Sequence, residues 1–138
     1  MADFPKRQRK LSLRVLTDLH QNGSVLFHHP YKIFYRIYPS PAGVHSEPKI
    51  VISIPKRNIK RAVDRNRIRR QIREAFRLKS SVLNKELSTS NVSIDLLCLY
   101  LPNEHIATSV FFSKMESLLA HLARLVTQNN LVSVDGND

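Results

Sequence analysis

The segment from Lys56 to Lys79 restricts the fold more than any other part of the chain, because it is strongly basic and also helically patterned. It contains eleven of the chain's 22 Lys and Arg residues but only two acids, Asp64 and Glu74. Its apolar residues recur at the spacing of one helix face: Ile68, Ile72, Ala75 and, at the edge, Phe76. A helix over about residues 61–78 must bury that face, and we expect it to pack on the sheet.

The opposite side of this predicted helix is basic. It carries Asn66, Arg70, Arg73 and Arg77, flanked by Arg67 and Arg69. Arginines this close repel one another unless an anion lies among them, and two acids are too few for a solvated face of salt bridges. The planar guanidinium group also matches phosphate geometry. With a net charge of +11, the pattern favours a nucleic acid partner over a merely soluble basic protein.

The residues just before the helix extend this positive surface. Lys56, Arg57, Lys60 and Arg61 precede it in a connecting loop, which contains no glycine and is therefore not a phosphate-binding P-loop. Arg65 projects towards the apolar side if the helix begins before it. It either sits where the chain is turning or buries its stem and reaches outwards.

Helix-like and strand-like segments alternate along the rest of the chain. We expect helices from Ser12 to about Asn22 and over 109–126, and strands over Ser24–Phe27, Tyr31–Tyr38, Lys49–Ile54 and Val92–Leu101. Residues 39–48 and the Ser- and Asn-rich residues 79–91 are expected to be connections. The order αβββαβα predicts an α+β fold, a single-layer, mostly antiparallel sheet of about four strands with packed helices, and the basic helix allows one parallel pairing.

The length fits one domain over residues 1–138, with an ordered core over about 4–126, a basic arm over 1–11 and a polar tail over 127–138. Cys98 is the only cysteine, which excludes an intrachain disulfide and agrees with a reducing cytoplasm. No apolar stretch approaches 18 residues, so we expect no membrane span. The basic N-terminus lacks a following apolar core and is not a secretory signal.

The run from Ile54 to Arg77, and above all Arg65-Asn66-Arg67 followed by Ile68, Arg70, Ile72, Arg73, Glu74 and Phe76, resembles the signature of the bacterial ribonuclease P protein component. Phe4-Pro5-Lys6 and the residues from Arg9 to Leu11 also look like that family. The resemblance covers about residues 4–126 and implies its layered fold, similar to that of some ribosomal proteins. Two positions depart from it: Pro55 stands where the family often has Ser or Ala, and Leu16 and Leu19 stand where many members have an aromatic residue.

The resemblance implies that the partners are a large catalytic RNA and precursor tRNA, with no membrane and no further protein required. The holoenzyme removes the 5′ leader by hydrolysis of one phosphodiester bond, and the RNA carries the chemistry with Mg²⁺ that it largely holds itself. The family's RNA-binding positions fall on Lys56, Arg57, Lys60, Arg61, Arg65, Asn66, Arg67, Arg69, Arg70, Arg73 and Arg77.

The resemblance also implies that the leader lies in a cleft between sheet and helices, which leaves open which sheet face lines it. Tyr31, Ile33, Tyr35 and Ile37 point to one side of the second strand, and Lys32, Phe34, Arg36 and Tyr38 to the other. The second set could supply stacking and phosphate contacts. Alternatively, its aromatics belong to the core and the leader lies on the opposite face.

No pair of residues reads as a general acid and base, and the six histidines show no metal-ligand spacing with one another or with Cys98. We therefore expect no catalytic group and no metal site in the protein itself.

A structural RNA-binding protein of ribosomal type is the alternative function, which the extended Arg-Asn-Arg pattern disfavours. A DNA-binding regulator is disfavoured because the basic helix lies between two strands rather than in a helix-turn-helix.

Overall fold

The computed structural model of the protein describes residues 13–40 and 48–136, with side chains as far as residue 128. The expected basic arm over 1–11 and most of the 39–48 connection lie outside the described residues.

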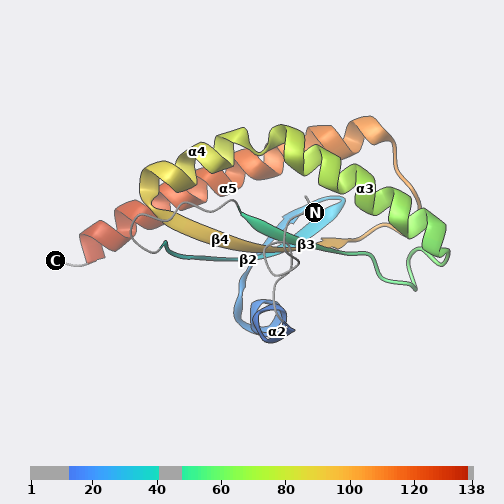
Figure 1. The fold of residues 1–138 in the computed structure, drawn as a ribbon, viewed down its shortest axis with the longest axis horizontal. Helices are drawn as coiled ribbons and strands as arrows, with labels where there is room; N and C mark the ends of the chain where they lie inside the picture. Colours follow the sequence, from blue (N-terminus) through green and yellow to red (C-terminus); the bar gives the residue numbers. More distant parts are fainter. Residues whose placement is uncertain (1–12, 41–47, 137–138) are drawn as a thin grey trace, which may run out of the picture.

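The described chain forms one four-stranded sheet with helices on both faces (Figure 1). The elements in order are α2 (Leu13–Asn22), β1 (Ser24–His28), β2 (Tyr31–Pro39), β3 (Lys49–Ser53), α3 (Ala62–Lys79), α4 (Ser81–Ser90), β4 (Val92–Tyr100) and α5 (Thr108–Gly136). The strand order is β1-β2-β4-β3, with β1/β2 and β2/β4 antiparallel and β3/β4 parallel. The predicted α+β class and the one parallel pairing are confirmed.

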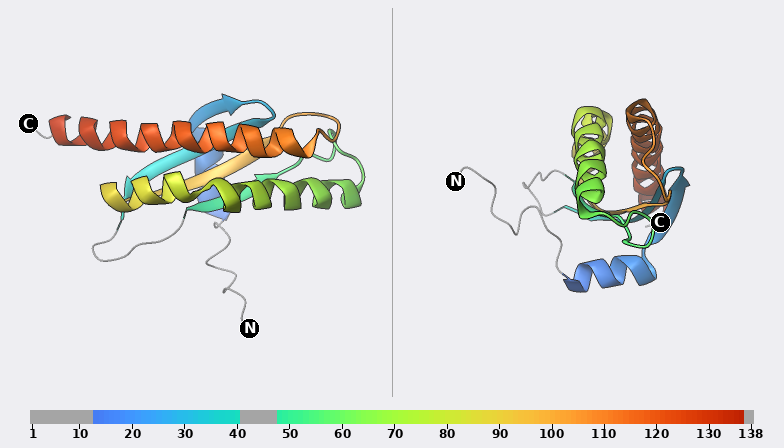
Figure 2. Two further views of the ribbon diagram at one scale, coloured as in Figure 1. Left: turned by 90° about the horizontal axis from the view of Figure 1, so that it is seen from above. Right: turned by 90° about the vertical axis from the view of Figure 1, so that its right-hand side faces the viewer.

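The helices divide unequally between the two faces of the sheet. Helices α3, α4 and α5 cover one face, with α3 and α4 running alongside α5 in the same direction, while α2 alone lies on the other face (Figures 1 and 2). Ile68, Ile72 and Ala75 of α3 are fully buried there, as the helical spacing predicts. The basic side of α3 is consequently left at the edge of the molecule.

The core fills the space between the sheet and the three helices. It draws on alternate residues of the strands, among them Tyr31 and Ile33 of β2, and on the apolar stripe of α5 from Phe111 to Val126. The Tyr31 hydroxyl donates a 3.0 Å hydrogen bond to the Phe111 carbonyl, which satisfies the one polar atom of a buried ring. Tyr35 and Ile37 pack against the same core, so β2 presents its Tyr31 face to the helices.

Residues 79–91 are not an irregular connection, and the prediction for them was wrong. They form α4, so the element order is αβββααβα. Ser and Asn are weak helix formers, but Leu83 and Leu87 are one turn apart and both buried against the core. Asn91 ends α4 in the left-handed conformation at φ 57°, a position that Asn tolerates better than most residues.

Helix α5 also extends beyond its predicted end at residue 126, as far as Gly136. The polar composition after Thr127 suggested a frayed tail, but polar residues do not by themselves end a helix that is already nucleated and packed. Among the described residues, no helix is both long enough and apolar enough to cross a bilayer.

Candidate nucleic-acid interface

Helix α3 carries its arginines on the side turned away from the core. Asn66, Arg67, Arg70 and Arg73 are exposed, and Arg69 is half-buried at the edge where α3 meets the sheet. The exposed arc predicted from the helical spacing is therefore confirmed in its placement. Because the buried residues fix the rotation of α3, the basic side chains project from a rigid element.

The arginines of α3 differ in whether an acid neutralises them. Arg77 is paired with Glu74, with Nη2 to Oε2 at 2.6 Å, and Arg61 lies 3.8 Å from Asp64. Within the described residues, no acid forms an ion pair with Arg67, Arg69, Arg70 or Arg73. These four side chains form what we call the open arginine cluster, and their charge is available to an external anion.

Arg69 is the most strongly perturbed member of this cluster. Partial burial lowers its pKa, and the charges of Arg73 and Arg65, each one turn away, lower it further. Its Nη1 donates a 3.0 Å hydrogen bond to Asn66 Oδ1, but this neutral partner does not offset the charge. An anion placed beside Arg69 would offset both the repulsion from the neighbouring arginines and the desolvation of the Arg69 guanidinium group.

Arg65 acts within the protein. Its Nη1 donates to the backbone carbonyls of Ile59 and Lys60, at 2.9 and 2.8 Å, so it folds back onto the loop that precedes α3. Asn58 ties the same loop to the end of β4 through the Tyr100 and Leu101 carbonyls, each at 3.3 Å. The loop is thereby held in place. All four of its basic residues are exposed: Lys56, Arg57, Lys60 and Arg61.

A cleft of about 550 Å³ lies between α2, the sheet and α3. Helix α2 contributes Leu16, Thr17, His20 and Gln21, the sheet contributes residues 51–54 and Leu97, and α3 contributes Arg69. The cleft thus has an apolar floor, polar side chains on one wall and an unneutralised cation on the other. Leu16 lines it where many members of the resembled family have an aromatic residue, so stacking at this position is not available here.

The second set of β2 side chains lies on the α2 face, but most of it is already engaged. Phe34 is buried at 5% exposure, with its ring centroid 4.9 Å from that of His20, so it offers no open face for stacking. Arg36 forms ion pairs with Asp18 of α2 and, at 3.7 Å, with Asp95 of β4. The Tyr38 hydroxyl donates to Asp95 at 3.1 Å. Lys32 is the member left near the surface, over the exposed ring of Phe27.

Two side-chain contacts, one at the cleft and one away from it, could not be read from the sequence, since each joins residues far apart in the chain. The Asp18–Arg36 pair fastens α2 to the sheet and so holds one wall of the cleft. His28 at the end of β1 and His121 of α5 lie with Nε2 and Nδ1 3.1 Å apart. No group of three His, Cys, Asp or Glu side chains suited to a metal ion occurs within the described ranges.

Comparisons with known proteins agree on one family. A family model described as Ribonuclease P matches residues 4–123 of the chain. The chain is 29% identical over 87 residues to the ribonuclease P protein component of Porphyromonas gingivalis, covering 62% of each protein. It is 35% identical over 77 residues to that of Chromohalobacter salexigens, covering 56% of this chain and 57% of the relative. These alignments span less than two thirds of either relative.

A solved structure is similar in fold. The RNase P protein from Thermotoga maritima superposes with a TM-score of 0.60 at 19% sequence identity, covering 80% of this chain and 94% of the other. At that identity the likeness supports only the shared arrangement of sheet and helices. The positions of the arginine side chains are therefore taken from this chain's own geometry.

Proposed function

Since this chain belongs to the ribonuclease P protein family, whose model covers residues 4–123, we propose that it is the protein subunit of ribonuclease P. It binds the catalytic RNA and the 5′ leader of precursor tRNA as one RNA-binding domain in the cytoplasm. In this role it promotes endonucleolytic removal of the leader, and the RNA performs the hydrolysis.

The observation that carries this proposal is the open arginine cluster. Four guanidinium groups on one rigid helix, without an acidic partner in the described part of the chain, are costly to hold together unless a polyanion lies across them. An RNA backbone supplies such a polyanion, and guanidinium groups match its phosphates. The loop residues Lys56, Arg57, Lys60 and Arg61 lengthen the same surface towards the start of α3.

The cleft beside Arg69 supports a second contact, with the leader. A single strand could lie along the apolar floor between α2 and β3, with a phosphate at Arg69 and polar groups from His20 and Gln21 against its bases. Because Arg69 belongs both to the open arginine cluster and to the cleft, the catalytic RNA and the leader would meet at this residue. The face of β2 that carries Lys32 continues from the cleft on the same side of the sheet.

The proposal places the Mg²⁺ of the reaction on the RNA, as the family resemblance implies. The described His, Cys, Asp and Glu side chains form no group of three that could hold a metal, and Asp95 and Asp18 are committed to Arg36. The protein's part is to lower the repulsion between two RNA molecules, which lowers the Mg²⁺ concentration they need.

The test is cleavage of precursor tRNA by the catalytic RNA at low Mg²⁺, with and without the protein. Wild-type protein should restore correct 5′ cleavage, and the Arg69→Ala, Arg73→Ala double variant should not. Arg77→Ala serves as a matched control, because the pair with Glu74 already neutralises that arginine. If wild-type protein has no effect on cleavage but still binds RNA, the role of a structural RNA-binding protein of ribosomal type becomes the better explanation.

A further inference from the structure

One row of side chains crosses the α2 face of the sheet from one edge to the other. Its members lie opposite one another in the strand register, one from each strand: Phe27 of β1, Lys32 of β2, Leu99 of β4 and Ser53 of β3. Residues paired across neighbouring strands point to the same face of a sheet, so the four side chains form one line. We call this line the transverse row. With strands about 4.8 Å apart, it is roughly 14 Å long.

Helix α2 contacts the sheet beside the transverse row rather than on it. Its His20 ring lies beside that of Phe34, and its Asp18 carboxylate pairs with Arg36. Both contacts fall further along β2 than the transverse row does. Every member of the row keeps part of its surface accessible, and Phe27 is 63% exposed. Among the described elements α2 alone lies on this face (Figure 1), so the row is open to a ligand.

The transverse row begins at the cleft beneath α2. Ser53 lines that cleft, as does His20, whose ring centroid lies 4.9 Å from that of Phe34. On the other side of Phe34, the Lys32 ammonium group lies 5.1 Å from the centroid of the same ring. The row therefore leads out of the cleft, across β4 and β2, to the β1 edge of the sheet. That edge is opposite to the β3 edge, which lies next to α3.

An aromatic ring and a cation lie together at the outer end of the row. Lys32 Nζ lies 5.2 Å from the ring centroid of Phe27 and 5.1 Å from that of Phe34, distances at which a ring face attracts an ammonium group. Among the described residues, no acid forms an ion pair with Lys32. The exposed Phe27 ring can stack on a base of any identity. Together the two residues supply the stacking surface and the phosphate contact that a single RNA strand uses on a sheet.

We propose that the transverse row carries the leader of precursor tRNA out of the cleft and across the sheet to the β1 edge. A base of the leader stacks on Phe27 and a neighbouring phosphate binds Lys32, while Leu99 and Ser53 form the uncharged floor that leads there from the cleft. The inference rests on the proposed function, because the leader is the strand that occupies the cleft.

The position of the catalytic RNA gives the leader a direction along this row. The catalytic RNA lies on α3, so the leader nucleotides nearest the cleavage site lie in the cleft, beside Arg69. Nucleotides further in the 5′ direction reach Lys32 and Phe27. At about 3.4 Å for each stacked nucleotide, the row accommodates up to about four of them. The contribution of Phe27 and Lys32 should therefore depend on the length of the leader.

The experiment measures the affinity of the assembled holoenzyme for precursor tRNAs whose leaders are lengthened one nucleotide at a time. Wild-type affinity should continue to rise after the leader has filled the cleft. Phe27→Leu keeps an apolar side chain but removes the ring, so it should weaken the binding of long leaders about fivefold, whereas Phe27→Tyr should bind them as the wild type does. Lys32→Ala should also weaken the binding of long leaders, and should reduce the log–log salt slope by roughly 0.7.

Lys85→Ala is the matched control for Lys32→Ala, because it removes the same charge from an exposed position on α4, on the opposite face of the sheet. It should leave the dependence of affinity on leader length unchanged. The melting temperature of each variant shows whether the fold is retained. Equal losses at every leader length would overturn the proposal, because a leader that ends within the cleft does not reach β1. A wild-type affinity that stops rising once the cleft is full would overturn it as well.

The two proposals fail separately. If the Arg69→Ala, Arg73→Ala variant does not restore cleavage, while Phe27→Leu and Lys32→Ala bind every leader as the wild type does, the transverse row is excluded and the proposed function stands. If the double arginine variant also restores cleavage as the wild type does, the proposed function itself is excluded.

Discussion

At the scale of single residues, the charge of α3 is divided between arginines that the protein neutralises and arginines that it leaves open. Arg77 and Arg61 have acids one turn away, and Arg65 is used to hold a loop. Arg67, Arg69, Arg70 and Arg73 have no described acidic partner. Counting basic residues therefore overstates the surface that an RNA can use, and the open cluster is the better measure.

This division predicts that replacing an open arginine with alanine weakens RNA binding more than replacing a neutralised one does. Arg69→Ala should raise the dissociation constant for the catalytic RNA about ten- to a hundredfold, because a hydrogen bond to a charged group contributes about 1.5–3 kcal/mol. Arg77→Ala should raise it less than about threefold, since Glu74 already offsets that charge. Filter binding at several salt concentrations checks both. Arg69→Ala should also reduce the log–log salt slope by roughly 0.7, and equal losses for the two variants would contradict the division.

His28 makes the stability of the protein depend on pH. Burial lowers its pKa below 6.5, and His121, Lys114 and Arg124 lower it further. A histidine whose pKa is lower in the folded state than in the unfolded state binds fewer protons when the protein is folded. Its contribution to stability is therefore fully present above pH 6.5, and it is lost as the pH falls through the pKa of the folded state. The melting temperature should therefore drop between pH 7.5 and 5.5. The His28→Gln variant should show a smaller drop in melting temperature than the wild type. The His29→Gln variant, changed at an exposed position, should show the same drop as the wild type.

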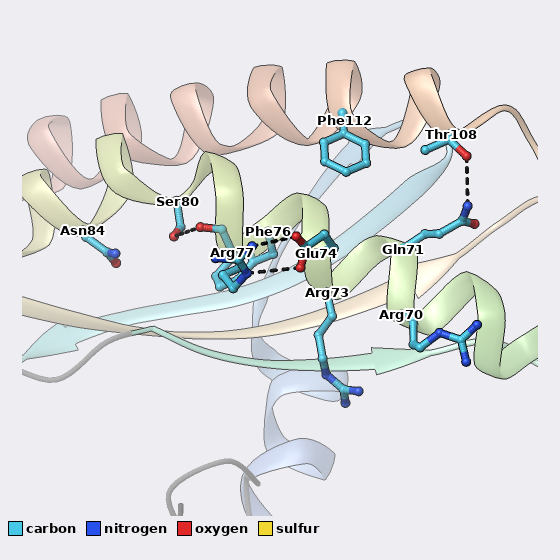
Figure 3. A pocket seen from close by; sticks show the side chains of 10 residues that line it. All are labelled: Arg70, Gln71, Arg73, Glu74, Phe76, Arg77, Ser80, Asn84, Thr108 and Phe112. Atoms are coloured by element: carbon cyan, nitrogen blue, oxygen red, sulfur yellow. Dashed lines mark hydrogen bonds and ion pairs between the residues drawn. The ribbon is translucent and has the colours of Figure 1, made fainter. Parts of the chain in front are cut away.

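At the scale of elements, α4 shows how packing overrides composition. Its Ser and Asn residues favour a loop, but Leu83 and Leu87 lie on one face and reach the core between α5 and the sheet. The same helix supplies Asn84 to the hollow between α3 and α5, which Phe112 also lines (Figure 3). A segment that looked like a linker therefore forms part of the wall of this hollow.

Substitutions in α4 should separate its buried face from its exposed face. Leu83→Ala should lower the free energy of unfolding by about 2–5 kcal/mol, as expected for a buried leucine. Val82→Ala, at a side chain that is 46% exposed, should change it by no more than about 0.5 kcal/mol. Urea denaturation followed by circular dichroism measures both. A small effect of Leu83→Ala would mean that α4 is not part of the cooperative fold.

The sequence was sufficient for elements whose pattern is local. The period of Ile68, Ile72 and Ala75 located the buried face of α3, and the apolar run from Val92 located β4. It was insufficient for contacts that depend on how elements dock. Neither the Asp18–Arg36 pair nor the burial of Phe34 under α2 follows from any spacing, because both depend on where α2 crosses the sheet. The cleft was expected only from family resemblance, and the hollow between α3 and α5 was not expected at all.

At the scale of the whole molecule, a net charge of +11 sets a cost on folding without RNA. The open arginine cluster gathers part of that charge on one helix, so the fold should gain stability from any multivalent anion that reaches it. Ligands that bind only the folded state stabilise it by mass action, by about 2.7 kcal/mol at one hundred times the dissociation constant.

Inorganic pyrophosphate should therefore raise the melting temperature of the free protein more than sodium chloride of equal ionic strength does. The Arg69→Ala, Arg73→Ala variant should lose most of this difference, while Arg77→Ala should keep it. Differential scanning fluorimetry over a pyrophosphate titration is enough to decide. Equal shifts with both salts would indicate general screening of repulsion rather than occupation of the open arginine cluster.

The position of β4 has a consequence for how the protein is made. It is the last strand in the chain, yet it lies between β2 and β3 and pairs with both. A growing chain therefore carries the β1–β2 hairpin, β3 and the complete basic helix before any strand can join them into a sheet. Until β4 and then α5 have been synthesised, α3 has its cationic side but lacks α5, the element on which its other side chiefly packs. The nascent protein is then able to adhere to RNA before it is folded, and the ribosome, itself largely RNA, is the first such surface it meets.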